Sequence, residues 1–551
     1  MSWFVCIISD KPFLEWEIEK FIQLHPITQN SIIKQSFYFA YDGEDDMLYK
    51  KNATEDDPGF KLVIGRGYLS KSTGYSMADG NDWDRLLSQQ YSPKEIDGHY
   101  MAIKIRETFV QVTNDIYGHY PIYFHKFDDS IIITNLHYFI TGVLPNKEWN
   151  LPAISALALM ANPLEQTGLL TNIQVMQPGA TFTYKKGKAT LTNRKYNFLA
   201  DGEQNIAKYL FSFKKAFELQ LGDSDFLNIP FEHNFTSRFA LSVWSNKPKE
   251  KWGIYYKKEA KFTPDTILDP YILTNLKITK IPDHTNINEV FKLYKNYVLT
   301  TGLSDFPDCF SSAGRFKKEA DVSEINLYSP LTEWLFEKSP TEKINKIFKT
   351  FKSESYRDFK KNFIMENHFL KKDFYKTLLK GAEAHFKLLV RSVNELPTGN
   401  QKVASAYGQY HYFIKNYQIK TKTNDFAWLN NFRHFYCPGI LYSLVCEHVQ
   451  HNILDKKFYL KTNDLHLNFA DEHLVYPKMP TKTTPLPNVN NIYFPFISNQ
   501  VGQMIEEAEG VQIYDFAKLL KIFKKAVQGN TEAIKIILKW TGFEMWRFYL
   551  N

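Results

Sequence analysis

One short segment of this sequence places acidic, amide, hydroxyl and basic side chains between an apolar run and a second apolar-patterned stretch. Its polar positions are Glu232, His233, Asn234, Thr236, Ser237 and Arg238. The apolar run at 226–230 has the length of a buried strand, and the residues from Ser237 onward predict a helix that Ser237 caps. Because unpaired N–H groups and the helix dipole meet between a strand end and a helix start, the segment predicts an anion-binding loop.

Two side chains of this loop act in opposite directions on an anion. Arg238 stands at the start of the expected helix, where a guanidinium can bind a phosphate or a carboxylate. Glu232 opposes such binding, because two like unit charges about 4 Å apart at an effective dielectric constant of ~20 repel by roughly 4 kcal/mol. A structural alternative stays open, in which Ser237 caps the helix and Arg238 forms a surface ion pair.

The elements that must position this loop belong to an α/β part of the chain, which follows a β-rich part. Up to about residue 145, short apolar or alternating runs predict strands at 37–40, 61–64, 99–105, 109–113 and 131–134. Turn signals separate them at Asp42-Gly43, Asp79-Gly80 and Asp97-Gly98. A hairpin is expected at 181–184 and 189–192, and further strands at 251–256 and 276–281.

Helical patterns fill most of the remainder. One expected helix starts at 151–152. Others cover 204–220, 286–297, 342–394, 407–416, 428–453 with an interruption at Pro438-Gly439, 515–528 and 531–540. A Pro- and Thr-rich strip at 476–489 predicts an extended loop. The last two helices are amphipathic, and we interpret their apolar stripes as packing faces rather than membrane anchors.

Composition limits the classes of function. A chain of 551 residues predicts two or more domains, and a net charge of +7 without a dense Lys/Arg tract does not indicate nucleic-acid binding. No apolar run reaches membrane-spanning length and no signal peptide is recognisable, so we expect a soluble cytoplasmic protein. The four cysteines are scattered; Cys6 lies in an apolar run and predicts a core position, and no metal site is expected.

Several stretches of the first 200 residues match the order and spacing of one known family. They are Asp-Gly-His-Tyr-Met-Ala-Ile-Lys from Asp97, Thr-Asn-Asp-Ile-Tyr-Gly-His-Tyr-Pro-Ile-Tyr from Thr113, and Ile-Ile-Ile-Thr-Asn from Ile131. Gln177-Pro178-Gly179, the hairpin after it and Tyr196 continue the match. The chain thus resembles the asparagine synthetase family, as a divergent member related to asparagine synthetase-like peptide cyclases and β-lactam synthetases.

The resemblance implies a mixed α/β fold in three parts. Residues 1–145 are expected to form a class II glutamine amidotransferase-like domain, an Ntn-type αββα sandwich of two antiparallel sheets between helices. Residues 146–200 form a linker and hairpin. Residues 201–551 form a pyrophosphatase-loop synthetase domain with a parallel sheet and a helical C-terminal part. Gln177-Pro178-Gly179 is expected to form a tight turn before the hairpin.

The resemblance also implies where chemistry takes place. In that family an N-terminal Cys hydrolyses glutamine, and Ser2 stands in its place here. The pyrophosphatase loop, Ser-Gly-Gly-Leu-Asp-Ser with a following Arg, corresponds to 232–238, of which Ser237 and Arg238 match. A second phosphate loop corresponds to 326–336, where Glu333 matches. The implied cofactors are ATP and Mg²⁺, the nucleotide site is the 232–238 loop, and the catalytic candidates are Ser2 and Glu333.

Two functional interpretations follow. In the first, both loops and the glutaminase are degenerate, and the chain is a non-catalytic or regulatory partner of another enzyme. In the second, it is an ATP-dependent carbon–nitrogen ligase of the asparagine synthase or cyclase type, which activates a peptide or small carboxylate as an acyl-adenylate. Binding of Mg-ATP discriminates between them.

Overall fold

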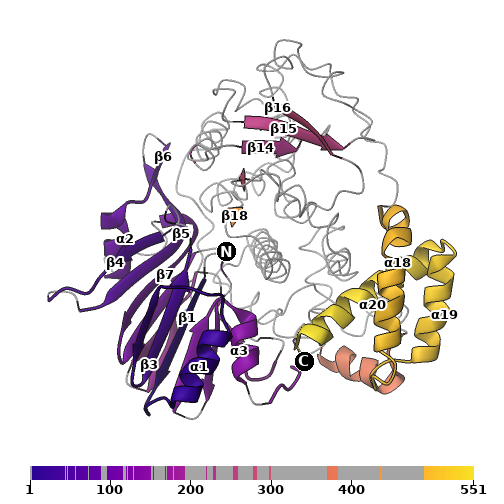
Figure 1. Cartoon of the computed structure of the whole chain (residues 1–551), viewed down its shortest axis with the longest axis horizontal. Helices are drawn as coiled ribbons and strands as arrows, with labels where there is room; N and C mark the ends of the chain where they lie inside the picture. The colour runs from indigo at the N-terminus through magenta and orange to yellow at the C-terminus, as the bar shows by residue number, and fades with distance from the viewer. Residues whose placement is uncertain are drawn as a thin grey trace, which may run out of the picture. The chain divides into compact units, whose positions relative to one another are not determined.

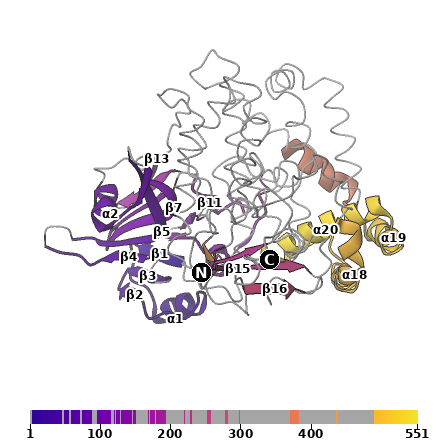
Figure 2. The same ribbon diagram turned by 90° about the horizontal axis from the view of Figure 1, so that it is seen from above.

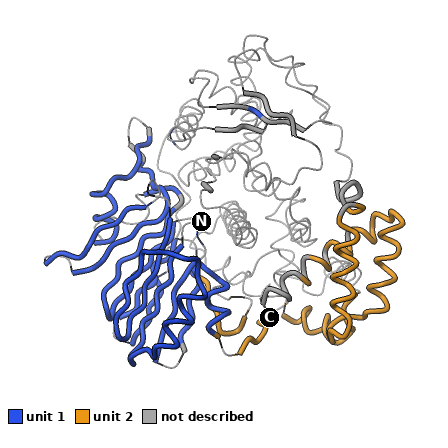
Figure 3. Tube along the Cα trace, in the orientation of Figure 1, with its two compact units in different colours: residues 1–143, 176–320, 416–479 blue, residues 144–175, 321–415, 480–551 orange. Residues whose placement is uncertain are grey.

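The computed structural model of the chain describes its β-rich first part, several strands of the second part and a helical C-terminal part. The described residues are 3–43, 45, 48–55, 58–71, 74–88, 96–115, 120, 122–127, 129–144, 146–150, 153, 168, 170–177, 179–185, 187–192, 219, 227–230, 252–257, 277–281, 297–298, 369–381, 435–436 and 489–550. The chain divides into two compact units, the first being 1–143, 176–320 and 416–479, and the second 144–175, 321–415 and 480–551 (Figure 3).

Two antiparallel sheets make up the described start of the first unit. Five successive strands of one sheet are β9 (Tyr123–Phe127), β10 (Ser130–Thr134), β1 (Trp3–Ser9), β3 (Phe37–Asp42) and β2 (Ser31–Lys34). The other sheet runs β13 (Lys188–Thr192), β12 (Thr181–Lys185), β8 (Phe109–Asn114), β7 (Ile96–Arg106), β5 (Phe60–Lys71) and β4 (Leu48–Lys51), with β6 (Gly74–Met77) paired to β5. All five strands predicted before residue 145 are confirmed, and so is the hairpin.

Side-chain alternation along the strands builds the core between the two sheets. On β1, Phe4, Cys6 and Ile8 enter this core, while the side chains between them face the opposite way. From the second sheet, apolar side chains such as Leu62, Ile64 and Met101 meet them. Every residue of β1 is buried, because the outer face of its sheet is covered as well.

Helices cover both outer faces. On the first sheet, α1 (Glu15–Gln23) packs Phe21 against Tyr38 of β3 at 5.5 Å between ring centroids and against Phe139 of α3 (His137–Val143) at 6.3 Å. On the second sheet, α2 (Gly80–Leu87) packs Trp83 edge-on against Tyr100 of β7 at 5.0 Å. The layers are therefore helix, sheet, sheet, helix (Figures 1 and 2).

The turn predicted at Asp97-Gly98 is wrong. Both residues lie inside β7, where Gly98 pairs with Gly67 of β5. Gly98 has φ +121°, and a Cβ there would lie 2.5 Å from the carbonyl oxygen of Arg66. A Cβ on Gly67 would lie 2.3 Å from the Trp83 ring. The glycines thus allow close approach within a ladder instead of reversing the chain.

The other two turn signals mark ends of elements. β3 ends at Asp42, as expected from Asp42-Gly43. Asp79 caps the first turn of α2 by accepting hydrogen bonds from the backbone N–H groups of Asn81 and Asp82.

Parallel strands follow in the second half of the first unit. β14 (Leu227–Pro230), β15 (Trp252–Lys257) and β16 (Lys277–Ile281) form a parallel sheet, which confirms three predicted strands. β17 (Tyr297–Val298) and β18 (Phe435–Tyr436) form a second parallel pair. The prediction of a helix through 435–436 is wrong, and so is that of a helix including Tyr297. Periodicity alone does not separate a short buried strand from a helical stripe.

The described part of the second unit is mainly helical. It contains α18 (Val489–Glu507), α19 (Phe516–Val527), α20 (Thr531–Leu550) and a helix at 372–381. The predicted end of the last helix at residue 540 is wrong, because buried Trp540, Thr541 and Glu544 carry α20 on to Leu550. The predicted helix through 369–371 is also interrupted, since Leu370 forms a bridge with Tyr514.

Other predicted elements lie wholly or mostly outside the described residues. These are the helix from 151–152, the helices at 204–220 and 407–416, the rest of the helix at 286–297, and the loop at 476–489, whose last residue instead begins α18.

Candidate functional site

The residues that the sequence assigns to chemistry all lie outside the described residues. They are Ser2, Glu232, His233, Asn234, Thr236, Ser237, Arg238 and Glu333. The structure does describe the strands beside them: β1 begins at Trp3, directly after Ser2, and β14 ends at Pro230, two residues before Glu232.

The start of β1 is fixed to the end of β10 by side-chain hydrogen bonds. The backbone N–H of Phe4 donates to Asn135 Oδ1 at 2.9 Å, and Thr134 Oγ1 donates to the Phe4 carbonyl at 2.6 Å. Thr134 Oγ1 also accepts from the backbone N–H of Leu136 at 2.9 Å. Thr134 and Asn135 are almost fully buried, so these bonds form away from competing water. They hold the chain immediately after Ser2 in one position.

Asn114 and Asp115, where β8 ends, form a second fixed point. The Asp115 carboxylate accepts from the backbone N–H of Tyr100 at 3.2 Å, and the Asp115 N–H donates to the Tyr100 carbonyl at 2.9 Å. Asn114 Nδ2 donates to the Gln177 carbonyl at 3.0 Å, while its Oδ1 accepts from the Ala180 N–H at 2.9 Å. Both side chains are fully buried.

The predicted tight turn at Gln177-Pro178-Gly179 is confirmed. It is closed by a hydrogen bond from the Ala180 N–H to the Gln177 carbonyl at 3.2 Å, and Gly179 has φ +64°. A glycine at the third position with positive φ is what a type II turn requires. The turn leads from β11 (Gln174–Val175) into the hairpin β12–β13. The Asn114 side chain is thus hydrogen-bonded both to a carbonyl and to an N–H of this turn.

These two fixed points lie at the same end of the sandwich. The Gly179 N–H donates to the Asp115 carbonyl at 2.7 Å, and three residues earlier the Met176 N–H donates to the Ile122 carbonyl at 2.8 Å. Ile122 directly precedes β9, whose Tyr123 pairs with Thr134 of β10. Thr134 in turn pairs with Val5 of β1. The segment 176–179 therefore connects the end of β8 with the end of the first sheet where β1 begins.

The space between the sheets becomes polar toward this end. On β5, Leu62 and Ile64 point into the core between the sheets. Arg66, two residues after Ile64 in the β5–β7 ladder, is on the same face of the strand. Arg66 and Asp97 are buried, at 7% and 8% exposure. The core therefore ends at a guanidinium and carboxylates rather than at apolar side chains.

The charges at this polar end affect the pKa of Tyr120. Burial raises the pKa of its phenol above the usual range, the negative charge of Asp115 raises it further, and the positive charge of Arg66 acts in the opposite direction. The phenol therefore stays protonated at neutral pH and can donate a hydrogen bond. The charges of Arg66 and Asp115 thus act in opposite directions on one neutral phenol at this end of the sandwich.

Cys6 is not available for chemistry at this end. It is fully buried inside β1, as the sequence predicts, and burial raises the pKa of its thiol well above the usual range. A thiol that does not ionise is a weak nucleophile. Among the described residues, no group of three or more His, Cys, Asp or Glu side chains is arranged to hold a metal ion.

Sequence reasoning did not select Arg66, Asn114, Asp115 or Tyr120 as site residues. The motif that begins at Thr113 contains Asn114, Asp115 and Tyr120. It therefore drew attention to these positions, but it did not indicate what the side chains do. The sequence did offer one signal: an amide and a carboxylate stand side by side at the end of an alternating strand. At a strand end polar side chains are usually interpreted as solvent-exposed turn residues, so they were not selected.

Comparison with known proteins gives little beyond this geometry. No family profile and no curated protein matches the sequence. Among solved structures, glutamine phosphoribosylpyrophosphate amidotransferase from B. subtilis, complexed with ADP and GMP, is 11% identical with a TM-score of 0.22, covering 58% of this chain and 83% of that chain. A structure of the allosteric regulatory enzyme of purine biosynthesis is 11% identical with a TM-score of 0.19, covering 58% and 82%. TM-scores this low establish neither the fold nor the activity of this chain.

Proposed function

We propose that this chain is a divergent relative of the asparagine synthetase family that acts as a non-catalytic or regulatory partner in the cytoplasm. One observation carries the proposal: β14 is a strand of a parallel sheet, and Glu232 follows its carboxyl end by two residues. Ligands of open α/β sheets bind just beyond the carboxyl ends of the strands. We therefore infer that residues 232–238 correspond to a phosphate-binding loop, which here begins with a negative charge.

The side chains of this loop do not fit ATP phosphates. Glu232 adds repulsion of roughly 4 kcal/mol at ~4 Å. His233 and Asn234 bring side chains to the positions where the family's glycines would let backbone N–H groups approach a phosphate. Neither feature alone excludes ATP binding. Together they remove the electrostatic attraction for the phosphates and the room for them to approach the backbone.

The first domain supports the same conclusion. Its described cysteine is buried in the core, and the residue at the position of the family's nucleophile is Ser2, whose hydroxyl needs an adjacent base to become a nucleophile. We infer that this domain, an Ntn-type sandwich in our proposal, does not hydrolyse glutamine. Its buried polar end then has a structural role.

A second function stays open because of Ser237 and Arg238. Both stand where a helix is expected to begin after β14, and an arginine there can bind a phosphate. In this alternative the chain is an ATP-dependent carbon–nitrogen ligase that activates a peptide or small carboxylate, with Mg²⁺ neutralising the phosphates and Glu333 near the reaction.

Isothermal calorimetry with Mg-ATP tests the proposal. The wild-type chain should give no binding heat, and Glu232→Ser should bind weakly at best, because removing the charge does not restore space. In a thermal shift assay, a ligand at ~100 times its Kd would add about 2.7 kcal/mol of stability, so the absence of a shift is informative. Micromolar binding by the wild type that is lost in Arg238→Ala would overturn the proposal in favour of the ligase.

Ammonia release tests the first domain separately. Purified protein with glutamine should release no more ammonia than a heat-treated control. Ser2→Cys supplies a more nucleophilic side chain at the same position, and we expect it to stay inactive as well. Clear release by the wild type, abolished by Ser2→Ala, would show a working glutaminase and contradict the expectation.

A further inference from the structure

The first sheet ends at β2, whose outer edge carries backbone groups that point away from the sheet. Among the described residues, β2 pairs with β3 alone, in antiparallel register. Directly before β2, the Tyr41 N–H donates to the Asn30 carbonyl at 3.0 Å. Because hydrogen-bonded pairs alternate along an antiparallel ladder, Ser31 and Ile33 direct their N–H and carbonyl groups away from β3. Such an edge is a template for a further extended segment.

One flank of α1 faces this edge. Phe21 lies over β3, and Leu24 packs on α3, because a Cβ at Gly142 would lie 2.5 Å from Leu24 Cδ2. The helices α1 and α3 lie side by side (Figure 1), and α3 packs on β9, on the far side of β1 and β3 from β2. Ile18 and Ile22 are on the flank of α1 opposite Leu24, so they face toward β2.

Exposed apolar side chains follow the same edge. Ile33 pairs with Tyr38, whose ring contacts α1, so Ile33 lies on the face of the sheet that α1 covers. Ile27 stands in the loop 24–30 between α1 and β2, which Thr28 Oγ1 ties to a carbonyl of β3 at 2.9 Å. We call this surface the isoleucine strip: half-buried Ile18, and Ile22, Ile33 and Ile27, whose exposed fractions are 49%, 44% and 94%.

The charges on α1 indicate what kind of partner fits. Glu15 and Glu19 form the row of the helix next to Ile18 and Ile22, and both are exposed. Neither forms an ion pair with a described residue, and like charges four residues apart destabilise a helix. Edge-to-edge pairing with a second copy would put two α1 helices on the same face of the joined sheet, with these acidic rows facing each other. A basic partner is attracted instead.

We propose that the β2 edge and the isoleucine strip bind an extended peptide segment in which basic and apolar residues alternate, added to the first sheet as a further strand. Backbone hydrogen bonds to Ser31 and Ile33 supply affinity, and alternate side chains supply selectivity. The proposal does not depend on the function proposed above, because every residue it uses lies in α1, β2 and the loop between them.

The two faces of the added strand meet different surfaces. On the α1 side, a lysine or arginine can lay its apolar stem along Ile22 and Ile33 while its charge reaches Glu15 or Glu19. On the other side lies Ile32, which pairs with Phe39 and packs, half-buried, against the core between the sheets. An apolar side chain there extends that core. One residue type therefore suits each face, which specifies an alternating pattern.

Fluorescence anisotropy with the full chain and the dye-labelled peptide Lys-Val-Lys-Val-Lys-Val-Lys tests the proposal. We expect saturable binding, and at least ~10-fold weaker binding of Glu-Val-Glu-Val-Glu-Val-Glu, whose charges oppose Glu15 and Glu19. Because the chain has a net charge of +7, non-specific attraction would favour the acidic peptide. Hydrogen exchange locates the site: the bound peptide should slow exchange in β2 and leave β13, an edge strand of the other sheet, unchanged.

Two variants and a control separate the contributions. Ile33→Pro removes an N–H that points away from β3 and keeps the ladder, so the basic peptide should bind about 10-fold more weakly. Ile22→Lys replaces an exposed apolar contact by a like charge, which the fold tolerates, and should also weaken binding about 10-fold. Val527→Lys in α19 is the matched control: Val527 is 58% exposed, and binding should not change.

The proposal is overturned if the basic peptide does not bind, if the acidic peptide binds as tightly, or if Ile22→Lys and Val527→Lys bind the basic peptide equally well. Sedimentation of the wild type should show no dimer that Ile22→Lys dissociates. Such a dimer would assign this surface to a second copy of the chain and overturn the proposal as well.

Discussion

Asn114 and Gly98 stabilise the polar end of the sandwich by different physical means. Asn114 uses its side-chain amide to bond a carbonyl and an N–H of the 177–180 turn, so a smaller side chain would leave the turn held only by its own bond from the Ala180 N–H to the Gln177 carbonyl. Gly98 contributes by lacking a side chain, which lets the β7 backbone pass the Arg66 carbonyl. Both residues keep Asp115 and Arg66 in fixed positions.

Gly98→Ala should destabilise the first unit far more than Gly187→Ala does. Both glycines have positive φ, +121° and +77°, but a Cβ at Gly187 meets nothing within 4 Å. We expect Gly187→Ala to lower the free energy of unfolding by about 1 kcal/mol. For Gly98→Ala, backbone strain and overpacking add to roughly 3–5 kcal/mol.

Denaturant titration read by hydrogen exchange in β5 and β7 peptides measures this unit apart from the rest of the chain. Equal losses in the two variants would show that the contact with the Arg66 carbonyl relaxes, and that Gly98 is kept for its backbone conformation alone.

At single positions, sequence reasoning succeeded where a residue type has one usual environment. Cys6 in an apolar run indicates a core position, and it is one. Arg66 and Asp115 were not selected, because buried charges depend on partners that the fold brings from distant strands. Asp97-Gly98 was misread because the same dipeptide suits a turn and a closely packed ladder.

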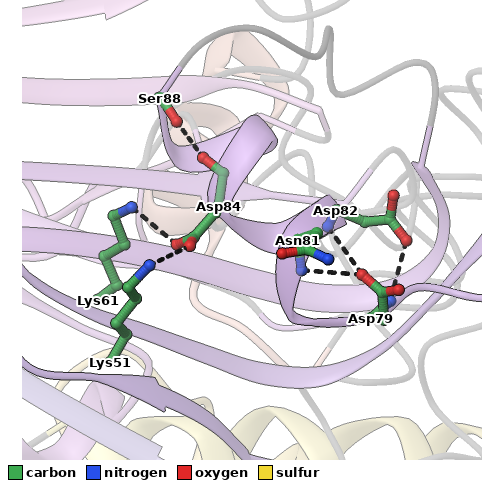
Figure 4. A network of polar contacts seen from close by, with 7 residues as sticks. All are labelled: Lys51, Lys61, Asp79, Asn81, Asp82, Asp84 and Ser88. Carbon is green, nitrogen blue, oxygen red and sulfur yellow. Dashed lines mark hydrogen bonds and ion pairs between the residues drawn. The ribbon is translucent and has the colours of Figure 1, made fainter.

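Among the elements, α2 is attached to its sheet by charge as well as by Trp83. Asp84 in this helix accepts hydrogen bonds from Lys51 of β4 and from Lys61 of β5, the latter at 2.7 Å, while Asp79 and Asp82 form a capping box at its start (Figure 4). The Lys61 side chain is 4% exposed and that of Lys51 is 44% exposed. The two ion pairs therefore differ in how much water screens them.

Asp84→Asn should cost about 2–4 kcal/mol of unfolding free energy, because it leaves the buried ammonium of Lys61 without its carboxylate. Lys51→Ala is the matched control: it removes the exposed partner of the same carboxylate, and we expect a loss of 1 kcal/mol or less, ~0.5 being typical. Denaturant unfolding followed by hydrogen exchange in the α2 peptide compares the two. Equal losses would show that burial of Lys61 carries no extra penalty.

The pH dependence of α2 has a defined sign. Burial of Asp84 raises its pKa, but the hydrogen bonds from Lys51 and Lys61 lower it more, so the folded pKa lies below the ordinary value of 3.8. The stabilisation is thus present above about pH 4 and is lost as the pH falls through the folded pKa. Asp84→Asn should remove this acid-dependent component.

Strands of this protein were easier to predict than the ends of its helices. The strands at 37–42 and 109–114 alternate or are apolar throughout, and flanking turn residues mark their limits. The end of α20 was placed at 540, ahead of Thr541-Gly542, but packing of Trp540 and Glu544 outweighs the local stop signal. The two-residue strand at 435–436 has no local signature, because its partner is 138 positions away at 297–298.

For the whole molecule, the sequence predicted a mixed α/β chain that passes from antiparallel to parallel sheets, and the described strands have that order. The domain boundaries at 145 and 200 stay predictions. So do the roles of Ser2, Glu333 and the 232–238 loop, because those residues lie outside the described part. Their chemistry depends on the relative placement of separate loops, which no local pattern specifies.

The middle position of β1 in its sheet has a consequence for synthesis of the chain. Phe4 finds its hydrogen-bond acceptor 131 positions later, at Asn135. A ribosome that adds ~5–20 residues per second needs roughly 7–26 s to cover that separation. Throughout this time the apolar residues of β1 have no partner on the β10 side, so the newly made segment depends on collapse or on a chaperone to avoid pairing with another nascent chain.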